Sequence, residues 1–339
     1  MTAVKNIYRQ IFKQAWDVVK NNKLLWSFGL FAALLGNGGE YQVLLKLLNN
    51  IRIGEGMHFI RPMAWMGQGN FRGVVNFLSY NPLEFALILM AAFAILFFIG
   101  FFIWMAIVSQ IALIEGANKS LARKKIDYNE GIDSGIKKFA PILGLNIIAK
   151  LLVLFIVFGL GLPLLFLIAS VNSLFSIVLY VLIFLILVSF GIIISFIAKY
   201  AVAYVVLKKE NFIDAIKLAI DLFLNNWVAS LEMALMLFLI NIIAGFAVVS
   251  VIILVSLPLA TIALIYFLSG FFVGAWLVII IMAIINFIII GFVGALLSAF
   301  QWTSWVALFK KLTSKEGVLS KIDRSVRAIP EWVKSHMHS

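Results

Sequence analysis

Cysteine is absent from this 339-residue chain. Its absence excludes disulfides, thiolate metal sites and thiol catalysis together. Histidine is scarce: His58 stands alone, and His336 and His338 lie near the end of the chain. Such scattered imidazoles predict no zinc site and no general-base cluster. The sequence contains no HExxH or GxSxG motif either, so we expect no catalytic residue, no cofactor and no metal.

Charge is also scarce, because 12% of the residues are charged while 64% are hydrophobic. A soluble domain has roughly one quarter charged and one half apolar residues. The formal charge of +12 could indicate nucleic-acid binding, but the bases lie in short segments beside apolar runs. Bases in that position are typical of topology determinants that also attract anionic headgroups. We therefore expect a lipid partner and no nucleic acid.

Two long stretches, 151–198 and 233–309, carry no charged side chain. Because about 20 apolar residues cross a ~30 Å hydrocarbon layer as a helix, each stretch can cross twice. The sequence therefore predicts an all-α, polytopic transmembrane helical bundle of about six spans. The expected spans are 24–36, 85–114, 141–169, 174–206, 227–257 and 271–309.

Two of the apolar pieces are unusually short. The first span, 24–36, suits a thin, tilted or partly re-entrant helix. The segment 259–269, between Pro258 and Gly270, is either a half-helix that dips back into the outer leaflet or an apolar connection.

The bases set the orientation. They gather at 5–23, 119–138, 208–217 and 310–334. Of the alternate connections, 170–173 and 258–270 carry none, and only 37–84 carries bases, namely Lys46, Arg52, Arg61 and Arg72. The positive-inside rule then places both termini in the cytoplasm. The expected organisation is one integral membrane domain, 1–309, followed by a basic cytoplasmic tail, 310–339. Within the domain, 1–23 is an amphipathic N-terminal helix and 37–84 an outer interfacial segment.

The N-terminal segment is patterned, unlike a secretory signal. Ile7, Ile11, Ala15 and Val19 recur at helical spacing opposite several bases. This pattern predicts an amphipathic helix, which either lies in the headgroup layer or packs on the bundle.

A threefold internal repeat is predicted. An amphipathic stretch with an aromatic residue, Phe12, Tyr128 or Phe212, leads each time into a membrane hairpin. The expected plan is three hairpins joined by cytoplasmic amphipathic elbow helices.

Two of the repeats carry a family resemblance. The run Lys209-Glu-Asn-Phe-Ile-Asp-Ala-Ile-Lys-Leu-Ala-Ile-Asp-Leu-Phe-Leu-Asn-Asn-Trp227 and the N-terminal Ala15-Trp16 through Asn22-Lys23-Leu-Leu-Trp26 resemble uncharacterised bacterial six-span membrane proteins. Their nearest named relative is the membrane domain of glycerophosphoryl diester phosphodiesterases. The catalytic domain of those fusions is missing here, so the resemblance implies a six-span fold, and no activity can be transferred from it.

Five polar residues at span depth form a candidate intramembrane polar site: Lys150, Glu232, Asn146, Asn241 and Asn286. Lys150 and Glu232 lie at similar depth in their spans, so they could form an ion pair, snorkel to the interface, or line a path for a solute or proton. The asparagines are typical of interhelical hydrogen bonds, with Gln110, Lys199 and Gln301 near the inner ends. Small-residue spacings such as Gly291-xxx-Ala295 predict close helix packing.

The outer segment holds Met57, His58, Met63 and Met66, which could present soft ligands to copper(I). Aromatic residues interleaved with them favour instead the buried face of an amphipathic segment on the membrane.

The sequence thus predicts a multi-pass protein of a bacterial-type inner (plasma) membrane. Its expected role is non-catalytic, through contacts with lipids bearing anionic headgroups, other membrane proteins or further copies of itself. The alternative is a small-solute transporter or permease that uses Lys150 and Glu232.

Overall fold

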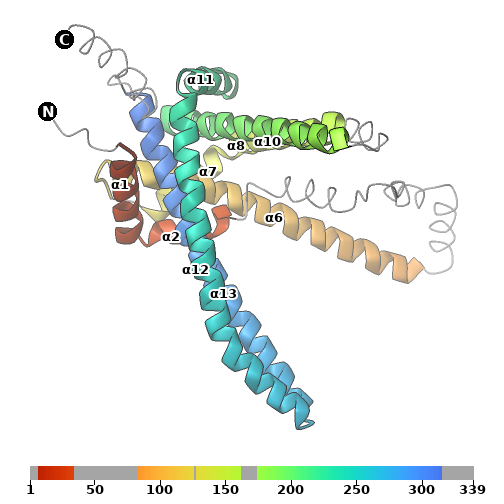
Figure 1. The fold of residues 1–339 in the computed structure, drawn as a ribbon. Coiled ribbons are helices and arrows are strands. Elements are labelled where there is room, and N and C mark those ends of the chain that lie inside the picture. The colour runs from red at the N-terminus through yellow and green to blue at the C-terminus, as the bar shows by residue number, and fades with distance from the viewer. Residues whose placement is uncertain (1–6, 34–81, 126, 162–173, 315–339) are drawn as a thin grey trace, which may run out of the picture. The chain divides into compact units, whose positions relative to one another are not determined.

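The computed structural model describes residues 7–33, 82–125, 127–161 and 174–314, and every regular element in these ranges is a helix (Figure 1). The predicted all-α class is confirmed for these ranges. The elements are α1 (Ile7–Asn21), α2 (Leu24–Ala32), α6 (Pro82–Leu121), α7 (Tyr128–Lys137), α8 (Phe139–Leu154), the π-helix η3 (Phe155–Gly161), α10 (Leu174–Ala203), the π-helix η4 (Tyr204–Lys208), α11 (Phe212–Asn225), α12 (Trp227–Leu268) and α13 (Phe272–Leu312).

These elements divide into two compact units. The first contains α1, α2, α7, α11, α12 and α13, with α6 from Ala106, α8 up to Asn146, and α10 from Phe196. The second contains α6 up to Met105, α8 from Ile147, η3, and α10 up to Ser195.

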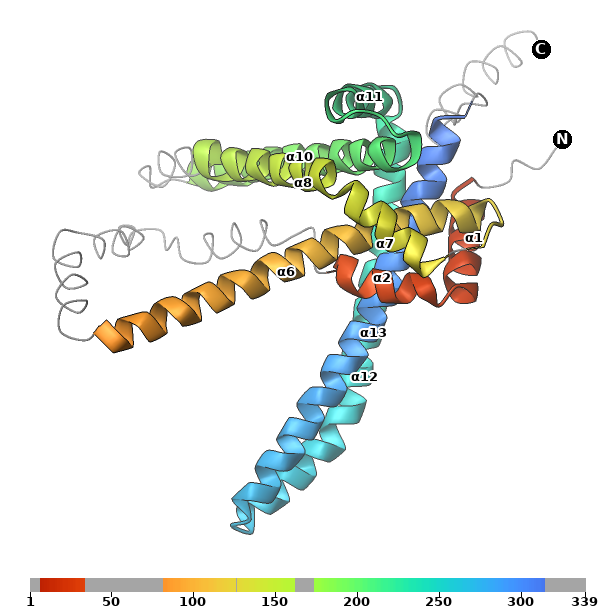
Figure 2. The ribbon, with the colours of Figure 1, turned by 180° about the vertical axis from the view of Figure 1, so that it is seen from behind.

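Helix α13 contacts three other helices of the first unit. It packs along α12, and α1 and α2 also lie against it. Figures 1 and 2 show α12 and α13 side by side as an antiparallel pair. Buried side chains on α13 concentrate between Ala295 and Leu312, so the protein core lies at the C-terminal half of this helix.

The predicted amphipathic helix at the N-terminus is confirmed as α1. Ile11, Ala15 and Val19 are fully buried, as their spacing predicts, while Arg9 and Lys13 are exposed. The buried face lies on α13, which agrees with the alternative in which the helix packs on the bundle.

The order of the described helices follows the predicted repeat, because α1, α7 and α11 are each followed by two apolar α-helices. At the start of α7, the Asp127 carboxylate accepts a hydrogen bond from the Asn129 backbone N–H at 3.3 Å, as an N-cap does. Phe12, Tyr128 and Phe212, the aromatic residues of the three predicted elbows, lie in α1, α7 and α11.

Among the described residues, four helices are long and apolar enough to cross a membrane: Phe85–Leu121, Val181–Lys208, Trp227–Leu268 and Phe272–Leu312. Helix α8 has 16 residues and α2 has 9, so these two do not reach that length. The interfacial segment 37–84 lies almost wholly outside the described residues, as do the tail residues beyond 314. Helix α13 includes Lys310 and Lys311, so the helix extends past the predicted start of the tail.

The predicted break after Leu257 is wrong. Helix α12 continues through Pro258 to Leu268, so 259–269 is neither a separate half-helix nor an irregular connection. Proline removes one backbone hydrogen bond, but ending a helix in lipid would leave several backbone groups unsatisfied. The chain turns instead at Gly270, whose φ of 79° favours glycine.

The second unit is made of apolar helical segments with few buried side chains. Phe93, Leu96 and Leu151 are exposed, as side chains that face lipid would be. Leu187 is buried, and a Cβ built on Gly161 would lie 3.0 Å from its Cδ1. This contact joins η3 to α10 within the unit.

Candidate functional site

The predicted interhelical hydrogen bonds of two asparagines join α12 to α13. Gln301 Nε2 donates to Asn241 Oδ1 at 2.7 Å, and Asn286 Nδ2 donates to Ser256 Oγ at 2.8 Å. Asn241 and Ser256 are about 22 Å apart along α12 at 1.5 Å per residue. Side-chain hydrogen bonds therefore join α12 to α13 at two well-separated positions along the helices.

The third asparagine joins α8 to α6. Asn146 Nδ2 donates to Gln110 Oε1 at 3.1 Å and also to the Ile142 carbonyl at 3.0 Å. Gln110 is buried. All three predicted asparagines thus find partners, and two of the partners are glutamines that the sequence places near the inner span ends.

Lys199 lies over an aromatic ring rather than beside a carboxylate. Its Nζ is 4.8 Å from the centroid of the Trp305 ring, which suits a cation–π contact. The neighbouring Tyr200 hydroxyl is 2.6 Å from Ser230 Oγ, so this part of α10 is bonded to α12. Aromatic contacts of Tyr200 with Trp305 and Phe309 add α13 to the same cluster.

Lys150 and Glu232 belong to different units, so their predicted pairing stays a prediction. Lys150 is exposed on α8, five residues before η3 begins. Glu232 is half-buried near the start of α12.

A charged network that the sequence did not single out is centred on Glu115 of α6. Its carboxylate accepts a hydrogen bond from the Ser134 hydroxyl of α7, and it lies 3.4 Å from Lys138 Nζ and 3.7 Å from Lys119 Nζ. Lys138 Nζ also donates to the Val206 carbonyl of η4 at 3.0 Å. The network therefore connects α6, α7 and η4. The available signal was an acidic residue one helical turn before a lysine, Glu115 before Lys119.

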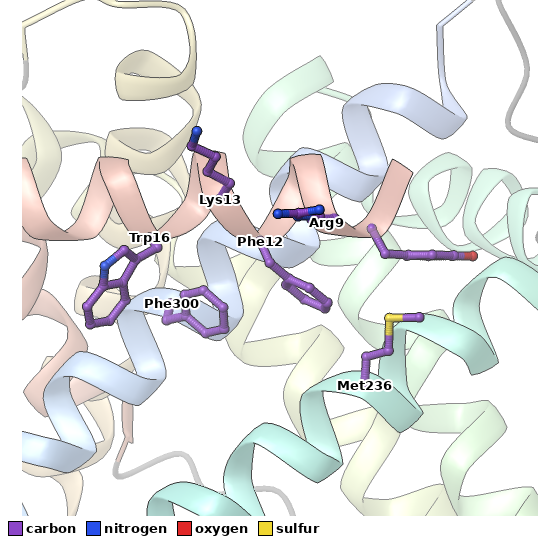
Figure 3. A pocket seen from close by; sticks show the side chains of 7 residues that line it. Arg9, Phe12, Lys13, Trp16, Met236 and Phe300 are labelled. Carbon is purple, nitrogen blue, oxygen red and sulfur yellow. The ribbon is translucent and has the colours of Figure 1, made fainter. Parts of the chain in front are cut away.

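An open groove of about 570 Å³ lies beside α1. We call it the α1 groove, and its lining residues are Tyr8, Arg9, Phe12, Lys13, Trp16, Met236 and Phe300. Figure 3 shows Phe12 and Trp16 extending from α1 toward the level of Phe300, with Met236 on the neighbouring α12. The ring centroids of Phe12 and Phe300 are 5.9 Å apart, so aromatic side chains make the groove floor.

No group of three or more potential metal-binding His, Cys, Asp or Glu side chains occurs within the described ranges. Met57, His58, Met63 and Met66 lie outside those ranges, as do His336 and His338, so the copper alternative stays untested.

Comparison with protein-family models, curated proteins and solved structures finds no match. The resemblance to the six-span bacterial proteins therefore stays a prediction.

Proposed function

We propose that this protein is a non-catalytic integral membrane protein of a bacterial-type plasma membrane, acting through contacts with lipids and other membrane proteins. In this proposal its helices form about six spans, arranged as three hairpins with both termini in the cytoplasm. The bacterial families that the sequence resembles are six-span proteins as well.

One observation carries the proposal. The three asparagines at span depth are used in helix–helix hydrogen bonds. The apolar side chains of α12 after Leu237 and of α13 before Ala295 are, by contrast, mostly exposed in their unit. Uncovered apolar helices need lipid or another membrane protein as a partner. Polar groups that are already bonded to each other have less capacity to bind a solute.

The topology can be tested by single-cysteine labelling, for which the natural absence of cysteine leaves no background. The variants Thr2→Cys and Ser339→Cys mark the two ends of the chain directly. Both should react with a membrane-impermeant maleimide only after the cells are opened. Labelling of either end in intact cells would overturn the proposed orientation.

The proposed mode of action can be tested by extracting the protein with a polymer that retains a ring of native lipid. Mass spectrometry should find lipids or membrane proteins enriched over those around an unrelated protein of similar size from the same membrane. Equal lipid and protein content in the two preparations would contradict the proposal.

The transporter is retained as a second candidate because Lys150 precedes η3. Short π-helical segments are frequent at functional sites, and an ionisable residue at span depth is by default a functional hypothesis. The double variant Lys150→Met/Glu232→Gln in proteoliposomes tests this candidate against Lys217→Met, whose side chain is 73% exposed. Solute-driven charge displacement that the wild type and Lys217→Met show and the double variant lacks would favour transport. The same displacement in all three proteins would remove these residues from consideration.

A further inference from the structure

The α1 groove lies where two kinds of surface meet. On α13, Phe287, Ile288 and Phe292 are exposed, whereas buried residues predominate from Ala295 onward. On α12, Leu237 is buried and the following residues are mostly exposed. Met236 and Phe300 of the groove lie close to both changes. The groove therefore adjoins the length of the helix pair that needs lipid around it.

The helix lengths agree with this position. Helices α12 and α13 have 42 and 41 residues, which at 1.5 Å per residue is about 60 Å each, whereas the hydrocarbon layer is ~30 Å thick. About half of each helix must therefore lie outside the hydrocarbon. The half of α13 that is buried against protein is also the half that ends in Lys310 and Lys311, which suits the headgroup side.

The charged residues of the groove lie at its rim, and apolar residues form its floor. Arg9 and Lys13 are exposed, lie one helical turn apart on α1, and form no ion pair with a described residue. The floor consists of Phe12, Phe300 and Met236. Trp16 is 52% exposed at one end of the groove and packs edge-on against Phe300, with ring centroids 6.3 Å apart. An indole ring that contacts apolar groups on one side and water on the other is typical of a membrane interface.

We propose that the α1 groove binds one anionic phospholipid. Arg9 and Lys13 hold the phosphate by charge-assisted hydrogen bonds, and an acyl chain lies over Phe12, Trp16 and Met236 toward the uncovered length of α12 and α13. This inference rests on the proposed membrane function and adds to it a ligand class and a defined site.

The test uses the full chain, purified in a neutral detergent, stripped of lipid and titrated with phosphatidylglycerol while native mass spectrometry counts the bound lipid. Arg9→Gln/Lys13→Gln is compared with Lys20→Gln/Lys23→Gln. The second pair removes the same charge from exposed positions that do not line the groove. Phosphatidylcholine with the same chains and soluble glycerol phosphate are titrated in parallel.

We expect the groove variant to bind phosphatidylglycerol about 30-fold more weakly, since each base near a membrane surface contributes about a fivefold preference for anionic lipid. The control pair should bind within about twofold of the wild type. Met236→Trp, which fills the groove without changing its charge, should also weaken binding. Glycerol phosphate alone should bind poorly because it cannot use the apolar floor.

Three results would overturn the inference: equal affinity for phosphatidylcholine and phosphatidylglycerol, equal weakening in the groove variant and its control, or undiminished binding by Met236→Trp. Each of these can occur while native lipids or membrane proteins are still retained by the extracted protein, so the groove can fail separately from the proposed function. Retention of neither in the native extraction would instead contradict the proposed function itself.

Discussion

The contact between α2 and α13 depends on a glycine. A Cβ built on Gly29 would overlap the carbonyl oxygen of Ala295 and would lie 3.2 Å from its carbonyl carbon and 3.3 Å from the Ala299 Cβ. None of these atoms can rotate away, because two belong to the backbone and the third is a methyl group fixed to it. Gly29→Ala must therefore push the two helices apart.

The magnitude follows from two opposing effects. Alanine in a helix gains about 1 kcal/mol over glycine, whereas overpacking a well-packed core costs about 1–3 kcal/mol. Because the obstruction at Gly29 is backbone, we expect a cost near the upper end of that range and a net destabilisation of about 1–2 kcal/mol. Gly245 is the matched control, since a Cβ built there meets nothing within 4 Å.

Thermal unfolding in detergent, followed by tryptophan fluorescence, measures the difference. Gly29→Ala should lower the Tm by several degrees, at roughly 2–4 °C per kcal/mol, and Gly245→Ala should leave it unchanged or raise it. If Gly29→Ala melts at the same temperature as Gly245→Ala, α2 and α13 do not approach as closely as described and the reasoning is refuted.

Three further predictions use the polar contacts. Asn241→Leu and Gln301→Leu should each destabilise the protein by about 0.6–1.7 kcal/mol in thermal unfolding, and the double variant should cost less than their sum because the two share one hydrogen bond; additive effects would contradict the pairing. Glu115→Gln should lower stability by about 1–3 kcal/mol and increase hydrogen exchange in α7, since it weakens the bonds to two lysines and a serine; unchanged exchange would count against the network. On the exposed face of α7, the hydrogen bond and the charge of Asp133 raise the pKa of Lys137. The contribution of this pair to stability is therefore present below the unfolded-state pKa of about 10.5, and it is lost as the pH rises through the folded-state pKa. Asp133→Asn should lower the lysine pKa in a ¹³C-lysine NMR titration, and an unshifted titration would show that the pair does not form.

The amphipathic elements could be predicted from the sequence because their two faces differ chemically. In α1 the spacing of Ile11, Ala15 and Val19 against exposed Arg9 and Lys13 indicates both the helix and its buried side. A helix with one polar face has only one side that protein can cover, so the spacing of its apolar residues shows which side packs on the rest of the protein.

The break predicted at Pro258 shows the opposite case. The rule that proline ends a helix comes from water, where a freed carbonyl is hydrated at little cost. In lipid the same carbonyl has no water, so continuing the helix leaves fewer unsatisfied groups than ending it. The sequence-based expectation therefore failed because a proline alone does not end a helix in lipid, and α12 continues to the turn at Gly270.

The pairing within the bundle could not be predicted for a related reason. Apolar residues cover every face of α12 and α13, so no periodicity distinguishes a side that meets protein from a side that meets lipid. What does distinguish them is the rare small or polar residue. The spacing Gly291-xxx-Ala295 indicates a close approach, but only the structure identifies Gly29 as the residue that meets Ala295. Likewise, the sequence shows that the amides of Asn241 and Gln301 each need a hydrogen-bond partner, but only the structure shows that they bond to each other. In such a chain the information about helix contacts is concentrated in the few residues that are small or polar. Substitution at those positions therefore tests helix packing without changing the capacity of the helices to insert in the membrane.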